Sequence, residues 1–240
     1  MMRRTLATLA VTALPLGLLA GCGDDSADDP FEGKSPEEVQ ALVIEAMQDV
    51  ESVRMSARMT SDGEALSLVV VLDRDANCDG SIAVDGAKAD IKSDGEWAYL
   101  RGDEAFWAVS TGSEAAATQL MAMIGDKWVR GPAADFNDFC DLDGFLEEFN
   151  EDPNEEGGFE IGDVEKVEGV DVVKLTKDEP DEETGDITTM WVAAEAPHRV
   201  VKLVAEGGDE PGEATFSKYN EDVDLDLPAD DEWIDLNTLG

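Results

Sequence analysis

Apolar residues after Ser35 recur at intervals of three and four positions, which predicts a helix with one apolar face. Proline follows Ser35 directly and Glu38 stands three residues after it, a combination typical of a capped helix start. Because a helix with a single apolar stripe must bury it against another element, we expect a sheet beside it. The apolar face comprises Val39, Leu42, Val43, Ala46, Met47 and Val50.

Beyond this helix the pattern changes to alternating apolar and polar residues, which is typical of half-buried strands. Residues 66–72 are apolar on both sides, so we expect that strand to be covered on two faces. The segments 103–124 and 142–149 have the spacing of helices. The order of helix, strands, helices and strands predicts an α+β fold, in which a strongly curved antiparallel sheet packs helices into its concave side. Strands are predicted at 53–60, 66–72, 80–85, 87–93, 95–101, 159–167, 170–176, 187–193, 199–205 and 214–219.

The start of the chain carries an export signal. Arg3-Arg4 precede an apolar run, Leu6 to Leu18, that is too short to span a bilayer as a mature helix. The run leads into Leu19-Ala20-Gly21-Cys22, which reads as a lipobox, so residues 1–21 are predicted to be a lipoprotein signal peptide. Lipidated Cys22 would then anchor the protein at the extracytoplasmic face of the cytoplasmic membrane. The alternatives are an ordinary signal peptide with a chance cysteine and an uncleaved N-terminal helix, and both Sec and twin-arginine export stay open.

Composition constrains the partners. The chain has 17 Lys and Arg residues against 57 Asp and Glu residues, a formal net charge of −40. Such a surface repels nucleic acid and also a layer of anionic lipid headgroups. The charge is interpreted either as a cation-binding coat or as the ordinary solvated surface of an acidic exported protein. Residues 22–34 are predicted to be a disordered tether with almost nothing to bury, and 35–240 a single domain.

Two further cysteines, Cys78 and Cys140, remain once Cys22 is assigned to the lipid. In an exported chain they most simply form a disulfide, which here would tie the first group of strands to the second helical segment. Two buried free thiols and a metal-binding pair are the alternatives. A metal pair needs further ligands, but His198 is the single histidine and its place before an apolar run indicates the start of a strand.

Candidate chemistry is sparse. Asp75, Asn77, Asp79 and Gly80 have the spacing of the start of a calcium loop, but Gly86 stands where the loop needs a bidentate glutamate. We therefore interpret the segment as a polar turn. The sequence contains no phosphate-loop, zinc-protease or serine-hydrolase signature, so we expect neither an enzyme nor a bound cofactor or metal.

Several short motifs add to the lipobox and the Ser35 helix. They are Gly95-Glu96-Trp97-Ala98-Tyr99-Leu100-Arg101-Gly102, Phe106-Trp107, Gly125-Asp126-Lys127-Trp128-Val129, Val167-Glu168-Gly169-Val170 and Thr189-Met190-Trp191-Val192. Together they resemble actinobacterial lipoproteins of the LppX/LprG type, a family similar to the LolA and LolB lipoprotein-localisation factors. The resemblance implies a β half-barrel with helices covering its concave face. It also implies an apolar cavity that in some members carries acylated lipids through the cell envelope.

The aromatic and methionine residues near the predicted sheet allow two interpretations. They form an ordinary core, or they line a cavity for an apolar ligand. The resemblance favours a cavity between the strand at 66–72 and the helical stripe near residue 120. We expect it to be bordered by Val69, Val71, Trp97, Tyr99, Leu120, Met121, Ile124 and Trp191.

Two functional hypotheses follow. The first is a lipoprotein that binds or transfers an apolar, acylated lipid, driven by the burial of methylene groups. The second is a non-catalytic interaction or sensory module whose core is filled by its own side chains. The expected partners are the membrane, through Cys22, and an apolar lipid, with a protein partner in the envelope left open.

The lipobox predicts that Cys22 is the mature N-terminus and carries acyl chains. Cys22→Ser should release or mislocalise the protein, because two or three acyl chains at about 0.8 kcal/mol per buried methylene supply the anchoring. Cell fractionation and mass spectrometry of the N-terminal peptide test this. An unmodified wild-type peptide, or a variant that stays in the membrane fraction with unchanged processing, would contradict it.

Overall fold

The computed structural model describes residues 29–61, 63–135, 140–147, 158–177, 179–180, 185–208 and 211–238. The predicted signal peptide, Cys22 and the start of the predicted tether lie outside these residues. Within the described part, the helices are too short or too polar to cross a membrane.

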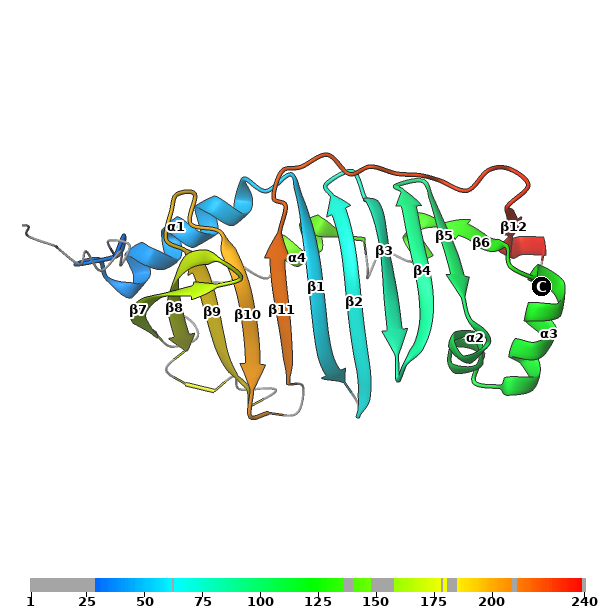
Figure 1. Cartoon of the computed structure of the whole chain (residues 1–240), viewed down its shortest axis with the longest axis horizontal. Coiled ribbons are helices and arrows are strands. Elements are labelled where there is room, and N and C mark those ends of the chain that lie inside the picture. Colours follow the sequence, from blue (N-terminus) through cyan, green and yellow to red (C-terminus); the bar gives the residue numbers. More distant parts are fainter. Residues whose placement is uncertain are drawn as a thin grey trace, which may run out of the picture.

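One open, curved sheet of twelve strands forms the framework (Figure 1). The strand order is β12-β6-β5-β4-β3-β2-β1-β11-β10-β9-β8-β7, so two meanders meet where β1 pairs with β11. Neighbouring strands are antiparallel except β12, which runs parallel to β6. The first meander comprises β1 (Ser52–Ser61), β2 (Glu64–Asp73), β3 (Asn77–Val84), β4 (Ala87–Asp94), β5 (Trp97–Gly102) and β6 (Trp128–Pro132). The second comprises β7 (Phe159–Val167), β8 (Val170–Lys177), β9 (Ile187–Ala193), β10 (Val200–Glu206) and β11 (Gly212–Ser217), and β12 is Trp233–Asp235.

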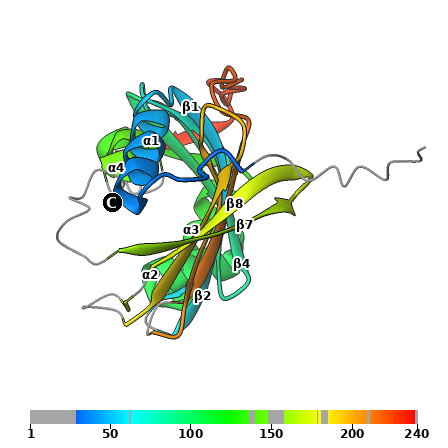
Figure 2. The same ribbon diagram turned by 90° about the vertical axis from the view of Figure 1, so that its left-hand side faces the viewer.

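Helices cover the concave face of this sheet, with α1 and α4 on one side of it in Figure 2. They are α1 (Pro36–Gln48), α2 (Glu104–Thr111), α3 (Glu114–Ile124) and α4 (Leu142–Glu147), with short 3-10 helices at Ala133–Asp135 and Leu236–Thr238. The predicted cap of α1 is present, since the Ser35 hydroxyl accepts the Glu38 N–H and the Glu38 carboxylate accepts the Ser35 N–H. Gly112, with a φ of 66°, separates α2 from α3, so the single helical stretch predicted there is two helices.

The two faces of the sheet differ because side chains alternate along each strand. On β2, Leu68, Val70 and Leu72 are buried in the apolar core, whereas Val69 and Val71 lie on the opposite face. We call the first the helix-covered face and the second the open face. The predicted fold class, a curved antiparallel sheet with helices on its concave face, is confirmed.

Two strands, β6 and β12, escape the sequence prediction. β6 has 5 residues and ends in Gly131-Pro132, and β12 has 3 residues. Residues 218–232, which we call the strap, run along the end of the first meander and deliver β12 to the far edge of the sheet (Figure 1). An alternating pattern this short carries little signal, and the partner of β12 is remote in sequence.

The packed part of the chain begins before Ser35. Phe31 is 2% exposed, and its ring meets the His198 ring edge-on at a centroid distance of 4.9 Å. Asp29 fixes this segment by accepting the Phe31 N–H at 2.9 Å. Phe31 therefore packs against the domain, although the sequence analysis placed it in the tether. The tether remains a prediction for the residues before Asp29.

The predicted disulfide joins Cys78 on β3 to Cys140, which precedes α4, with a Cα–Cα distance of 5.6 Å. Both residues are buried. The bond ties the helical layer to the first meander, as expected from the sequence.

Replacing both cysteines, as Cys78→Ala with Cys140→Ala, should lower the free energy of unfolding by about 4 kcal/mol. The bridge joins residues with a sequence separation of 62. Without it the unfolded chain gains conformational entropy, which stabilises the unfolded state relative to the folded one. Urea unfolding measures the difference, with Cys22→Ser, which keeps the bridge, as the matched control. Equal stability of the two proteins would contradict the prediction.

Candidate functional site

The helix-covered face is apolar but unevenly covered. α2 contacts β3, β4 and β5 toward one end of the sheet, and α1 contacts β7 at the other. Between these ends, apolar side chains of the helix-covered face are only half-buried. We call five of them the apolar strip: Leu66, Met55, Ala214, Leu203 and Met190, on β2, β1, β11, β10 and β9.

Strand register makes the apolar strip continuous over β9, β10 and β11. Met190 lies opposite Leu203, and Leu203 lies opposite Ala214. On β1, Ala214 faces the buried Ala57, two residues from Met55. Residues paired in this way share one face of an antiparallel sheet. Leucine and methionine side chains adapt to irregular apolar shapes. The strip therefore offers a flexible apolar surface several strands wide.

Helix side chains fill two other parts of this face. Near the middle of the sheet, Phe145 of α4 stacks on Phe216 of β11, with ring centroids 5.4 Å apart. Toward one end of the sheet, Phe106 and Trp107 of α2 and Ile124 of α3 are buried in the core.

Trp107 places a polar group in this apolar surrounding. Its indole nitrogen is buried and, within the part of the chain that the structure describes, has no hydrogen-bond acceptor. Leaving such a donor unsatisfied costs about 1–3 kcal/mol. A carbonyl group of a ligand would satisfy it.

The eight residues expected to border one cavity are divided between the two faces. Leu120, Met121 and Ile124 of α3 lie with the core, Ile124 within it and the other two packed against it. Residues on opposite faces of a sheet cannot line one cavity, so the expectation of a single cavity bordered by all eight is corrected here. A strand that is apolar on both sides does not reveal which side the helices cover. The five residues on the open face are Val69, Val71, Trp97, Tyr99 and Trp191.

On the open face, tryptophan rings lie beneath basic side chains. The Arg130 guanidinium carbon is 4.2 Å from the Trp97 ring centroid and 3.6 Å from that of Trp233. Arg101 lies 4.4 Å from the Trp128 ring, and Lys202 lies 5.5 Å from the Trp191 ring. Rings that the sequence suggested for a core or a cavity are thus cation–π partners. The sequence does contain a signal for this arrangement. Trp97, Tyr99 and Arg101 are spaced by two residues, so they lie on the same face of one strand.

Arg130 also fastens β12 to the sheet. Its guanidinium pairs with the Asp235 carboxylate at 2.9 Å, and the Trp128 N–H donates to the Glu232 carbonyl at 2.9 Å. The hydrogen bond from Arg130 holds the pKa of Asp235 below its ordinary value. We call Trp97, Arg130, Trp233 and Asp235 the clasp.

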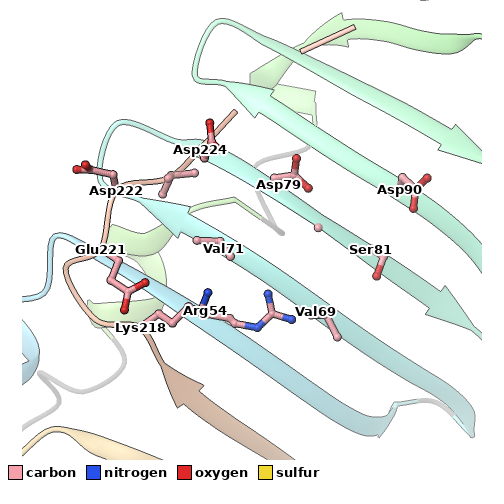
Figure 3. Close-up of a pocket in the computed structure, with 12 residues that line it drawn as sticks. Arg54, Val69, Val71, Asp79, Ser81, Asp90, Lys218, Glu221, Asp222 and Asp224 are labelled. Carbon is pink, nitrogen blue, oxygen red and sulfur yellow. The ribbon is translucent and has the colours of Figure 1, made fainter. Parts of the chain in front are cut away.

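The strap covers a cleft of about 430 Å³ on the open face (Figure 3). Val69 and Val71 form part of its floor beside Arg54, and Glu221 and Asp222 of the strap face them. The start of the strap is held by Tyr219, whose buried hydroxyl donates to the Val200 carbonyl, and by Asn220, whose side chain accepts the Glu51 N–H at 2.9 Å. Burial raises the pKa of Tyr219.

The segment with calcium-loop spacing is a polar turn. The Asp73 carboxylate accepts the N–H groups of Asp75 and Asn77 at 3.0 Å each, and Asp79 pairs with Lys92. Among the described residues, no group of three or more His, Cys, Asp or Glu side chains is placed to hold a metal ion.

No protein-family model matches this chain, and no curated protein sequence matches it. Solved structures with a similar fold include two mycobacterial lipoproteins. Lipoprotein LppX of Mycobacterium tuberculosis is 17% identical, with a TM-score of 0.51, and the match covers 80% of this chain and 100% of LppX. LprF of Mycobacterium bovis is 17% identical, with a TM-score of 0.55, and the match covers 81% of this chain and 99% of LprF. At this identity the likeness shows the fold alone, and that fold is the one the sequence motifs implied.

The clasp should loosen in acid. Because the folded-state pKa of Asp235 is lowered from 3.8, its ion pair contributes stability above that pH and loses it as the pH falls through the folded-state value. The indole resonance of Trp233 should therefore shift as the pH falls below about 4. In Asp235→Asn this shift should be absent, and an identical shift in wild type and variant would rule the clasp out as its cause.

Proposed function

We propose that this protein is an exported, lipid-anchored envelope lipoprotein that binds or transfers an apolar, acylated lipid on the helix-covered face of its sheet. The apolar strip carries the proposal, because Met190, Leu203 and Ala214 form a continuous apolar surface that the helices leave half-exposed. Soluble proteins rarely leave such surfaces without a partner.

Burial of one acyl chain supplies enough free energy for binding. Each buried methylene contributes about 0.8 kcal/mol, so about ten methylenes of one acyl chain supply roughly 8 kcal/mol. That corresponds to a dissociation constant of about 1 μM before ordering costs. The strip crosses five strands, which gives one chain room to lie along it.

The Trp107 N–H, which has no acceptor among the described residues, supports an acylated ligand over a plain hydrocarbon. An ester carbonyl accepts one hydrogen bond and has an alkyl chain attached on one side. A ligand of this kind satisfies the donor and covers apolar surface at the same time.

The anchor and the tether set the working distance of the domain. If Cys22 is lipidated, the 7 residues from Cys22 to Asp28 separate the membrane from the described domain by at most about 25 Å. The proposed location is the extracytoplasmic face of the cytoplasmic membrane. The acidic surface repels anionic headgroups and keeps the domain off the bilayer except at its anchor.

Changing the apolar strip should abolish lipid uptake without unfolding the protein. Leu203→Glu places a carboxylate in the strip, and it should reduce uptake of a fluorescent phosphatidylcholine from vesicles about tenfold or more, the equivalent of two lost methylenes. Val204→Glu is the matched control, since Val204 is the next residue of β10 and points to the open face. Thermal unfolding of both variants reports on the fold.

A photo-cross-linking measurement on the wild type avoids substitutions altogether. A phosphatidylcholine with a diazirine on one acyl chain should label Met55, Met190 or Leu203. Labelling confined to the open face, or none at all, would leave the interaction module with a filled core as the better account.

A further inference from the structure

We propose that the open face carries a separate binding site for a phosphoryl group, in a cleft that we call the basic cleft. It has a volume of about 610 Å³. Its basic lining residues are Arg54, Arg58, Lys166 and Lys202.

Three strands and one hairpin build the basic cleft. β1, β11 and β10 form the floor, with Arg54 opposite Ser217 and Thr215 opposite both Ser56 and Lys202. The tip of the β7–β8 hairpin, residues 166–168, forms a wall. Figure 2 shows this hairpin reaching out on the side of the sheet away from α1 and α4.

The charge in this cleft is opposite to that of the whole chain. Four cations line it against two carboxylates, in a chain whose net charge is −40. Glu213 is shared, because Arg58 lies 3.5 Å and Lys202 3.3 Å from its carboxylate. Lys166 pairs at 2.6 Å with Asp171, which lies outside the lining. The remaining three cations, Arg54, Arg58 and Lys202, outnumber the two lining carboxylates, so net positive charge faces the cleft.

Arg54 differs from the other cations of the cleft, because no carboxylate of the described residues pairs with it. It is half-buried, and among the described residues it forms no ion pair, although the chain has 57 acidic residues. Its guanidinium lies on the open face beside Val69, at the border with the cleft under the strap (Figure 3). An unpaired, half-buried arginine is available to an external anion.

The donor set favours a phosphoryl group. A guanidinium presents a planar fork of N–H donors that binds two phosphate oxygens at once. The hydroxyls of Ser56 and Ser217 flank Arg54 and can donate to a third oxygen. Long-range repulsion from the acidic surface is screened beyond about 8 Å at physiological salt, so the local cations determine the affinity.

This site is independent of the proposed lipid site. The sheet is one layer thick, and the apolar strip and the basic cleft lie on its opposite faces. A lipid whose chains lie on the strip cannot place its headgroup in the cleft. The phosphoryl group therefore belongs to a soluble phosphate ester or to the headgroup of a lipid that stays in the bilayer.

Calorimetric titration of the full mature chain with inorganic phosphate and with glycerol 3-phosphate tests the site. Arg54→Gln should weaken binding at least tenfold, and Arg54→Lys should weaken it less, because it keeps the charge and loses the fork. Arg101→Gln is the matched control, since Arg101 lies on the same face but pairs with Asp90 at 2.9 Å and is absent from the lining. Arg101→Gln should keep the wild-type affinity.

Vesicles distinguish the source of the phosphate. If the Cys22→Ser protein binds phosphatidylglycerol vesicles and this binding depends on Arg54, the ligand is a lipid headgroup. If the protein binds glycerol 3-phosphate in the calorimeter but does not bind the vesicles, the ligand is a soluble phosphate ester. The proposal is overturned if none of the three probes binds, or if Arg54→Gln and Arg101→Gln weaken binding equally. Lipid uptake by the apolar strip is unaffected in either case.

Discussion

A sheet of one layer presents alternate side chains to two environments, and this constraint organises the whole molecule. On the helix-covered face, residues such as Val70 of β2 join a single apolar core with α1 to α4. The same strand directs Val71 to the open face. Twelve strands are wider than the helices can cover, and the apolar strip is the part of the face left half-exposed.

On the open face, no helix or second sheet of the described residues covers the aromatic rings. Basic side chains cover them instead, as Arg130 does between Trp97 and Trp233. Arginine and lysine can cover apolar surface with their stems while their charged ends stay in water. Most of these cations also have carboxylate partners, such as Asp235 for Arg130 and Asp90 for Arg101. Arg54 differs from these cations, because it forms no ion pair among the described residues.

Local patterns in the sequence were sufficient for the elements of the fold but not for the site. The α1 cap at Ser35 and Glu38 and the long alternating strands depend on neighbouring residues, so the sequence predicts them. β12 depends on Trp233 and Asp235 meeting Arg130, which lies about a hundred residues earlier. The cavity prediction failed for Val69 and Trp191 because apolar character alone does not say which face of a strand the helices cover. Phe31 was assigned to the tether because one buried ring in an acidic segment leaves no periodic signal.

The central claim is that the half-exposed apolar face holds a lipid, with Trp107 donating to it. Native mass spectrometry of the full protein, released gently from its own membranes, tests this most directly. The account predicts the mass of the mature chain plus one non-covalently bound acylated lipid, which dissociates on activation while the anchor at Cys22 remains. A protein that carries its anchor alone, at every activation energy and from several preparations, would contradict it.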